Sequence, residues 1–148
     1  MRARDLAEPY PLFDLDADAL EAVRAVGANR LVGLVVTEPD GSPKAIVPGS
    51  QVLRFVIPEY VQSDPSLARV ISEEAAEQIV RRLEGRSVRE LLPDRPHELP
   101  VVNGDDTVLE IAAIMARMRS PLVAVVEGGR IVGIVTTSRL LQVALAES

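Results

Sequence analysis

The sequence predicts a mixed α/β (α+β) fold, in which one unit of strand, helix, strand, strand and helix occurs twice around a helical connector. The first observation is a repeated string: "AIVPGSQVL" (Ala45–Leu53) and "GIVTTSRLL" (Gly133–Leu141) share their order of aliphatic, turn-forming, hydroxyl and long polar residues. The second is that the helix and strand signals before each string also recur in the same order. Self-similarity of this kind is the signature of a duplicated supersecondary unit.

Composition narrows the class of protein. A chain of 148 residues with 47% hydrophobic and 26% charged residues fits one compact domain, or two small units that share a core. No apolar run approaches the ~20 residues of a membrane helix, and the acidic N-terminal string does not resemble a signal peptide, so a cytoplasmic protein without membrane insertion is expected. A net charge of -6 argues against nucleic acid as a partner. The absence of cysteine and the single histidine leave little material for catalysis or metal binding.

The first unit is expected over residues 1–60. Asp18, followed three residues later by Glu21, has the spacing of a capping box, so a helix is predicted to begin there and to end near Gly27. Apolar runs bounded by turn residues predict the strands, and Pro58 stops the closing helix. The predicted strands and closing helix are Leu12–Leu15, Leu31–Val36, Lys44–Val47 and Gly49–Ile57.

A helical connector is expected over residues 61–86. Asp64 and Pro65 suit the first positions of a helix, and apolar residues recur every four positions, which predicts one helix from about Pro65 to Glu84. Its apolar face should dock on the rest of the molecule. The apolar positions are Ile71, Ala75, Ile79 and Leu83; the acidic Glu73, Glu74 and Glu77 are expected to face solvent.

The second unit is expected over residues 87–148. It opens with "SVRELLP", much as the first opens with "RARDLAEP", and continues through a proline-rich segment around His97 that is predicted as a loop. Thr107 and Glu110 have capping-box spacing, and a helix follows that contains Met115 and Met118 on its core-facing stripe. The remaining strands and helix are predicted at Leu122–Val126, Ile131–Val135 and Ser138–Ala146. The residues expected to be buried in the strands are Leu34, Val36, Ile46, Val123, Val125, Ile131 and Ile134.

These units resemble a CBS domain pair, also called a Bateman module. The resemblance is strongest in "LPVVNGDDTVLEIAAIMARMRSPLVAVVEGGRIVGIVTTSRLL" and covers nearly the whole chain. It implies two units packed sheet to sheet about a pseudo-twofold axis, which suits a unit too small to bury its own apolar faces. It also implies two equivalent clefts that hold adenosine-containing ligands: AMP, ADP, ATP or S-adenosylmethionine. The alternative is an unrelated α/β domain with an internal duplication.

The resemblance implies particular roles for the repeated string. A Thr or Ser would contact phosphate, and an Asp at the end of the motif would hold the ribose hydroxyls. In the second copy Thr136, Thr137 and Ser138 supply hydroxyls at a helix start, but Arg139 replaces the acid. A guanidinium only donates hydrogen bonds, so it suits a phosphate rather than a ribose diol. We therefore expect this copy to bind the anionic end of a nucleotide.

The base and the first copy complete the expected site. The resemblance places the base against apolar strand residues, here Val101, Val102 and Val123. In the first copy Pro48 stands for the Thr and offers neither hydroxyl nor amide hydrogen. Gln51 stands for the Asp and can take one ribose hydroxyl. The first cleft is therefore expected to be the poorer of the two.

Each of these groups also has a purely structural interpretation. The hydroxyl cluster at residues 136–138 can serve only to cap the last helix. Arg139 can face solvent or pair with Glu147. His97 lacks partners at metal-ligand spacing, and the acidic residues at turns are expected to act as caps, so no metal site is expected.

Two function classes remain after an enzyme is set aside, because no nucleophile–base pair can be assembled. The first is a regulatory module that senses an adenosyl ligand and signals to an unidentified enzyme or transporter. The second is an interaction or dimerisation scaffold whose clefts no longer bind ligand. A homodimer is expected in either class, because the helices at 18–27 and 107–119 carry apolar residues on more than one face, including Leu109 and Ile114.

Overall fold

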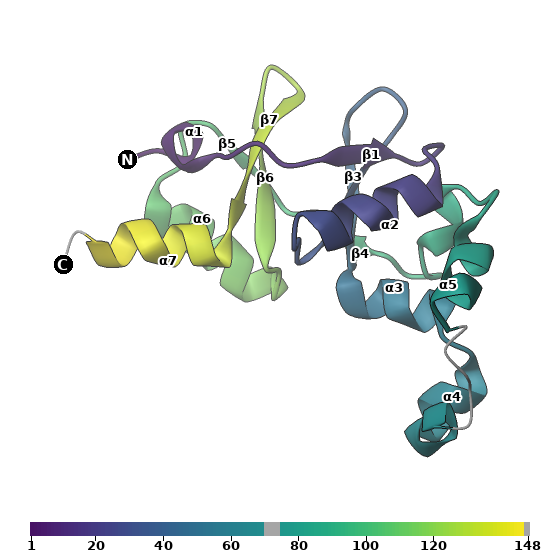
Figure 1. Cartoon of the computed structure of the whole chain (residues 1–148). Helices are drawn as coiled ribbons and strands as arrows, with labels where there is room; N and C mark the ends of the chain where they lie inside the picture. Colours follow the sequence, from purple (N-terminus) through teal and green to yellow (C-terminus); the bar gives the residue numbers. More distant parts are fainter. Residues whose placement is uncertain (70–74, 147–148) are drawn as a thin grey trace.

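The computed structural model describes residues 1–69 and 75–146 and contains two sheets, each with helices beside it (Figure 1). The first sheet has the strand order β1-β2-β3-β4 and the second has the order β5-β6-β7. The strands are β1 (Leu12–Asp14), β2 (Gly33–Thr37), β3 (Pro43–Pro48), β4 (His97–Glu98), β5 (Val101–Asn103), β6 (Leu122–Glu127) and β7 (Arg130–Thr136). The helices are α1 (Ala3–Leu6), α2 (Ala19–Ala28), α3 (Gly49–Val56), α4 (Glu59–Ser63), α5 (Ala75–Leu83), α6 (Val108–Met118) and α7 (Thr137–Ala146), with 3-10 turns η1 (Pro65–Arg69) and η2 (Val88–Leu91).

The predicted duplication is confirmed by the strand register. β1 pairs with β2 in parallel and β2 with β3 in antiparallel, and the same pattern relates β5, β6 and β7. The helix before each hairpin ends alike, because Arg30 and Arg119 both adopt the left-handed conformation, with φ of 52° and 51°. The predicted caps form as well: the side chains of Asp18 and Thr107 accept hydrogen bonds from the amides of Glu21 and Glu110.

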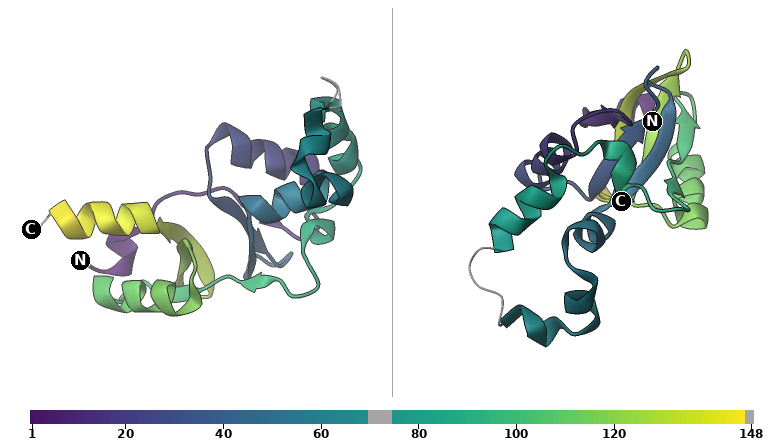
Figure 2. Two further views of the ribbon diagram at one scale, coloured as in Figure 1. Left: turned by 90° about the horizontal axis from the view of Figure 1, so that it is seen from below. Right: turned by 90° about the vertical axis from the view of Figure 1, so that its right-hand side faces the viewer.

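The two units pack sheet to sheet, as expected, and helices cover the outer faces. Figure 2 shows the helices of the two units at opposite ends of the molecule with the sheets between them. The contact between the sheets consists of aliphatic side chains that are almost entirely excluded from solvent. They are Val35, Ile46, Leu99, Leu122, Ala124 and Ile134.

Each sheet also packs against its own helices, which gives two further cores, the first core at the first sheet and the second core at the second sheet. Each core contains the segment that opens the other sequence repeat. The first core contains Val88 and Leu91 from η2, although residues 87–92 open the second repeat. The second core contains Ala3 and Leu6 from α1, although these residues open the first repeat. Figure 1 shows the chain running from α1, beside the second sheet, across to β1 in the first sheet. Each of these two cores therefore combines residues from before position 60 with residues from after position 86, so neither core coincides with one sequence repeat.

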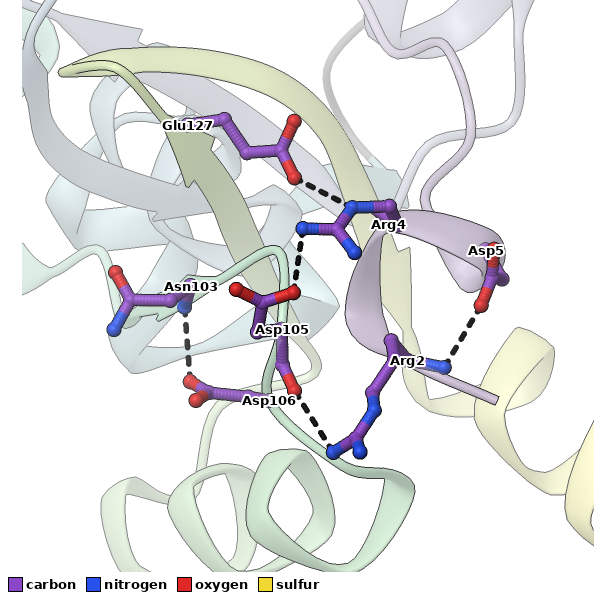
Figure 3. Close-up of polar contacts among 7 residues, drawn as sticks. All are labelled: Arg2, Arg4, Asp5, Asn103, Asp105, Asp106 and Glu127. Atoms are coloured by element: carbon purple, nitrogen blue, oxygen red, sulfur yellow. Dashed lines mark hydrogen bonds and ion pairs between the residues drawn. The ribbon is translucent and has the colours of Figure 1, made fainter.

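Polar contacts fix the N-terminal segment to the second unit (Figure 3). The Arg4 guanidinium lies 2.6 Å from an Asp105 carboxylate oxygen and 2.8 Å from a Glu127 carboxylate oxygen. The hydrogen bond to Glu127, followed by that to Asp105, raises the pKa of Arg4 above its ordinary value. The Arg4 amide also donates to the carbonyl of Gly104. These contacts join residues at least 100 positions apart in sequence.

Several detailed predictions are corrected by the structure. Ile131 is only half-buried, and Met118, the last residue of α6, is 36% exposed. His97 lies in strand β4 and pairs with Ile46, so the proline-rich segment is not wholly a loop. The other six residues that were expected to be buried in the strands are buried: Leu34, Val36, Ile46, Val123, Val125 and Ile134.

The connector also differs from the single helix predicted from Pro65 to Glu84. It contains the extra helix α4, the exposed 3-10 turn η1 and the helix α5, which contacts α2 and α3. Leu83 is buried in the first core, so the apolar face of this helix docks as predicted. The predicted positions Ile71, Glu73 and Glu74 lie outside the described residues.

Candidate ligand clefts between the sheets

The hydroxyls of the second-copy motif are largely satisfied by the protein itself. Thr136 immediately precedes α7, and its hydroxyl accepts a hydrogen bond of 3.2 Å from the Arg139 amide. The same hydroxyl lies 3.2 Å from that of Ser138. The Thr137 hydroxyl donates to the Pro121 carbonyl at 3.1 Å. The capping interpretation of this cluster is thus realised, and among the three hydroxyl residues Ser138 is the one whose hydroxyl contacts only another hydroxyl of the cluster.

Arg139 is held by the N-terminal segment. Its Nε lies 3.4 Å from the Leu6 carbonyl oxygen and 3.7 Å from a Glu8 carboxylate oxygen, and the side chain is 28% exposed. Glu8 is itself fixed, because its amide and carbonyl both bond to Ile134 of β7 at 3.0 Å. The proposed partner Glu147 lies outside the described residues. The guanidinium at the end of this motif therefore already has a carboxylate partner within the chain.

The residues expected to contact a base lie in different environments. Val101 is 43% exposed at the edge of the second sheet, so a ligand can reach it. Val102 and Val123 are buried in the second core beneath the helices. The expectation that they contact a base is therefore corrected: alternate residues of a strand face opposite sides, and these two face away from the space between the sheets.

Tyr10 links the N-terminal segment to the first sheet. Its hydroxyl donates a hydrogen bond of 2.7 Å to the Gly33 carbonyl, and the ring packs against the contact between the sheets. Burial raises the pKa of Tyr10, because the ionised phenolate would lose solvation there. Tyr10 therefore stays neutral under ordinary conditions and joins the N-terminal segment to the contact between the sheets.

A cavity of about 330 Å³ lies at the first-copy motif, at the cleft that the sequence ranked as poorer. Strands β3 and β4 form one wall, and the end of α6 with the loop after it forms the other. The volume lies at the small end of the range for small-molecule sites. The lining residues are Ile46, Pro48, His97, Glu98, Met118, Arg119, Ser120 and Pro121.

The lining of the cavity at the first-copy motif combines apolar and charged side chains. Ile46 and Pro48 provide apolar surface, while His97 and Glu98 bring an imidazole and a carboxylate. Within the part of the chain that the structure describes, Arg119 forms no ion pair. Its guanidinium is therefore available to an anion, in contrast to that of Arg139.

Gln51 lies on α3 and is half-buried, but it lines a different cavity together with Arg54 and Phe55. Sequence reasoning missed His97 and Arg119 as cleft residues, because it placed one in a loop and the other at a helix end. The internal repeat could have identified His97, because its equivalent in the other copy is Glu8. Alignment of the two copies sets His97 opposite Ile46 in the way that Glu8 lies opposite Ile134.

Across the described ranges 1–69 and 75–146, the structure shows no cluster of three or more acidic or histidine side chains that could hold a metal ion. Within the same ranges, no helix has both the length and the apolar character needed to cross a membrane.

Comparison with known proteins places this architecture in one family. The family model for the CBS domain matches residues 88–146. A solved CBS domain-containing protein of unknown function from Kribbella flavida DSM 17836 is 54% identical, with a TM-score of 0.91 over 98% of this chain and 99% of that chain. A search of the curated proteins finds no match.

Two more distant structures share the fold and were solved with ligands. CBSX2 in complex with AMP is 15% identical, with a TM-score of 0.67 over 99% of this chain and 97% of that chain. The CBS domain pair of MJ0100, in complex with 5′-methylthioadenosine and S-adenosyl-L-methionine, is 14% identical, with a TM-score of 0.66 over 100% of this chain and 98% of that chain. At such identities the likeness concerns the fold alone. The duplicated βαββα units, their sheet-to-sheet packing and the 54% identical relative together show that this chain belongs to the CBS domain-pair proteins.

Proposed function

We propose that this CBS domain pair is a non-catalytic regulatory module that binds an adenine nucleotide or a related adenosyl metabolite between its sheets and signals to a separate partner protein. The observation that carries the proposal is the cavity at the first-copy motif, whose lining combines apolar side chains with the unpaired Arg119. Support comes from the two distant members of the fold that hold AMP or S-adenosyl-L-methionine.

In this proposal the base lies against Ile46 and Pro48, and a phosphate or carboxylate of the ligand contacts Arg119. Pro48 and Gln51 supply neither the Thr hydroxyl nor the ribose-binding acid that the family resemblance implies. Loss of a charge-assisted hydrogen bond of about 1.5–3 kcal/mol weakens affinity roughly ten- to a hundredfold. Binding should therefore be weak, and stronger for ATP or ADP than for adenosine.

The cleft at the second-copy motif has a separate requirement. A ligand anion at Thr136, Ser138 and Arg139 must first displace the Glu8 carboxylate, which already faces the guanidinium. Replacing Glu8 by Gln removes that competing charge while it keeps the shape of the side chain. We therefore propose that this cleft binds anions only weakly in the unmodified protein.

Titration calorimetry with ATP, AMP, adenosine and S-adenosylmethionine tests the proposal. Arg119→Asn removes the cation and keeps a residue that tolerates the left-handed backbone. Arg30→Asn makes the same change at the equivalent position of the first unit and serves as the matched control. We expect ATP affinity to fall at least tenfold in Arg119→Asn and to stay unchanged in Arg30→Asn. An unchanged ATP affinity in Arg119→Asn would show that Arg119 does not contact the ligand.

The second-copy cleft is tested in the same titrations with two further variants. Glu8→Gln should raise ATP affinity there, or add a second binding event. Adding Arg139→Ala to the Glu8→Gln variant should abolish that gain, because the double variant lacks the cation that the Glu8 carboxylate otherwise contacts. If Glu8→Gln binds ATP no better than the unmodified protein, Glu8 does not compete with the ligand.

A ligand-free scaffold is the second candidate function. It is favoured by the internal partners of Thr137 and Arg139 and by the exposed apolar side chains on α6 and α7, of which Leu109 is 79% exposed and Leu141 is 49% exposed. Such side chains fit a homodimer. Absence of both heat and thermal stabilisation with every nucleotide at millimolar concentration would favour this function, because a ligand that binds only the folded state raises its stability.

A further inference from the structure

A second cavity, of about 410 Å³, lies away from the contact between the sheets, on the helical side of the first unit. It opens between α3, α4 and the end of α5, three elements in the right-hand half of Figure 1, with α4 lowest. We call it the helical groove and define it by its lining residues: Gln51, Arg54, Phe55, Ile57, Glu59, Gln62, Arg82 and Pro93.

Two arginines on facing helices line the helical groove without counter-ions. Arg54 of α3 and Arg82 of α5 form no ion pair among the residues that the structure describes. The neighbouring arginines behave differently, because Arg81 lies 3.9 Å from a carboxylate of Glu77 and Arg86 lies 3.3 Å from one of Glu90. Arg54 and Arg82 thus line one cavity, and neither has an ion-pair partner among the described residues.

The backbone that carries both arginines is fixed by side-chain hydrogen bonds. The Gln62 amide donates to the Arg54 carbonyl at 3.0 Å and to the Ile57 carbonyl at 2.7 Å, which ties α4 to the end of α3. The Arg86 Nε donates to the Arg82 carbonyl at 2.9 Å. The groove is therefore held open by contacts that do not involve either guanidinium.

The wall between the two arginines is also ordered. The Arg86 guanidinium lies over the Phe55 ring, 5.7 Å from its centroid, a cation–π contact that joins the end of α5 to α3. Phe55 and Ile57 give the groove an apolar base. Two guanidinium groups above an apolar base match a ligand with a phosphate head and a short carbon body.

We propose that the helical groove binds the phosphate group of a small phosphorylated molecule, with Arg54 and Arg82 as the two phosphate ligands. Guanidinium groups present paired donors that match phosphate oxygens, and two of them can satisfy a doubly charged group. The pair is notable in a chain of net charge -6, whose average surface repels anions. The volume of the groove, about 410 Å³, lies within the range typical of small-molecule sites.

Glu59 is the acid that lines the helical groove, and it opposes anion binding by like-charge repulsion. Its presence makes a specific prediction: Glu59→Gln raises affinity for phosphate, whereas the arginine variants lower it. A non-specific attraction to a basic surface would not depend on this one position more than on other exposed acids, such as Glu84.

Titration of the full chain with inorganic phosphate, pyrophosphate and glycerol phosphate, followed by NMR or calorimetry, tests the proposal, with glycerol as the uncharged probe. Arg54→Gln and Arg82→Gln should each weaken binding about tenfold or more. Arg81→Gln is the matched control, because this arginine lies on the same helix but is paired to Glu77. All three side chains are exposed, so circular dichroism should show unchanged folding.

The three probes separate the sources of the phosphate. Binding of glycerol phosphate tighter than inorganic phosphate indicates a phosphorylated metabolite, and equal binding indicates free phosphate. Absence of binding by all charged probes at millimolar concentration, or equal losses in Arg81→Gln and Arg82→Gln, would overturn the proposal. In Arg119→Asn, phosphate-induced changes in the NMR signals of α3 and α5 should be the same as in the unmodified protein, which separates binding in the helical groove from binding at the cleft between the sheets.

Discussion

A substitution at Leu6 tests quantitatively whether the opening segment of each repeat packs in the core of the other repeat. Leu6 belongs to the first repeat in sequence, yet its side chain is fully buried in the second core. Leu6→Ala therefore removes a completely buried side chain and leaves a cavity, which costs about 2–5 kcal/mol. At a central value of about 3 kcal/mol, Tm should fall by roughly 6–12 °C for a chain of this size.

A double-mutant cycle locates the lost contacts. Val135 of β7 lies in the second core with Leu6, and Val47 of β3 is its equivalent in the first core. We expect Leu6→Ala and Val135→Ala to be coupled by at least ~0.5 kcal/mol, because the two side chains share one core. Leu6→Ala and Val47→Ala should be additive within about 0.5 kcal/mol. Leu91→Ala, the equivalent of Leu6→Ala, should show the reverse pattern.

Equilibrium unfolding in urea, monitored by circular dichroism at one fixed protein concentration, measures these free energies of unfolding. Leu109→Ala is the control, because that side chain is 79% exposed and its loss should change stability by no more than about 0.5 kcal/mol. Coupling of Leu6 to Val47 without coupling to Val135 would show that α1 packs in its own repeat. A loss below about 1 kcal/mol for Leu6→Ala would show that α1 is not part of a core.

Gly133→Ala places a methyl group 2.7 Å from the Cβ of Ala7 and 3.1 Å from the Glu8 carbonyl oxygen, so it should destabilise the protein by roughly 1–3 kcal/mol. Gly27→Ala, in α2 with nothing within 4 Å, should instead stabilise by about 0.5–1 kcal/mol, and thermal unfolding that shifts both variants in the same direction would contradict this reasoning. For the homodimer, light scattering should report twice the 16.0 kDa mass at tens of micromolar, and Leu109→Lys should shift the mass toward the monomer. A mass of one chain for the unmodified protein at that concentration would refute the homodimer prediction.

Local signals in the sequence predicted most of the fold. The caps at Asp18 and Thr107 form hydrogen bonds with residues three positions later, so their partners are visible in a short window. The continuous apolar runs of β2 and β6 correspond to strands buried on both faces. These features depend on spacing within one element, and spacing is what a sequence displays directly.

The exchange of the leading segments could not be predicted in the same way. "RARDLAEP" and "SVRELLP" carry equivalent apolar residues, so Leu6 and Leu91 fit either core by composition alone. The choice between the cores depends on long-range contacts, such as that of Arg4 with Asp105 and Glu127. The partner of Arg139 was missed for the same reason, because Glu8 lies at the other end of the chain.

The exchange also determines the chemistry of the two clefts. Each motif strand pairs with the segment that precedes the first strand of the other repeat: Glu8 with Ile134, and His97 with Ile46. The equivalent positions therefore carry a carboxylate in one cleft and an imidazole in the other. The carboxylate pairs with Arg139, whereas the imidazole lies in the cavity that contains the unpaired Arg119. A symmetric backbone thus carries different charged groups at the two motifs, although Glu98 also brings a carboxylate to the first-copy cavity. It follows that a nucleotide that stabilises this protein should do so chiefly through the first-copy cleft, at a stoichiometry of one per chain.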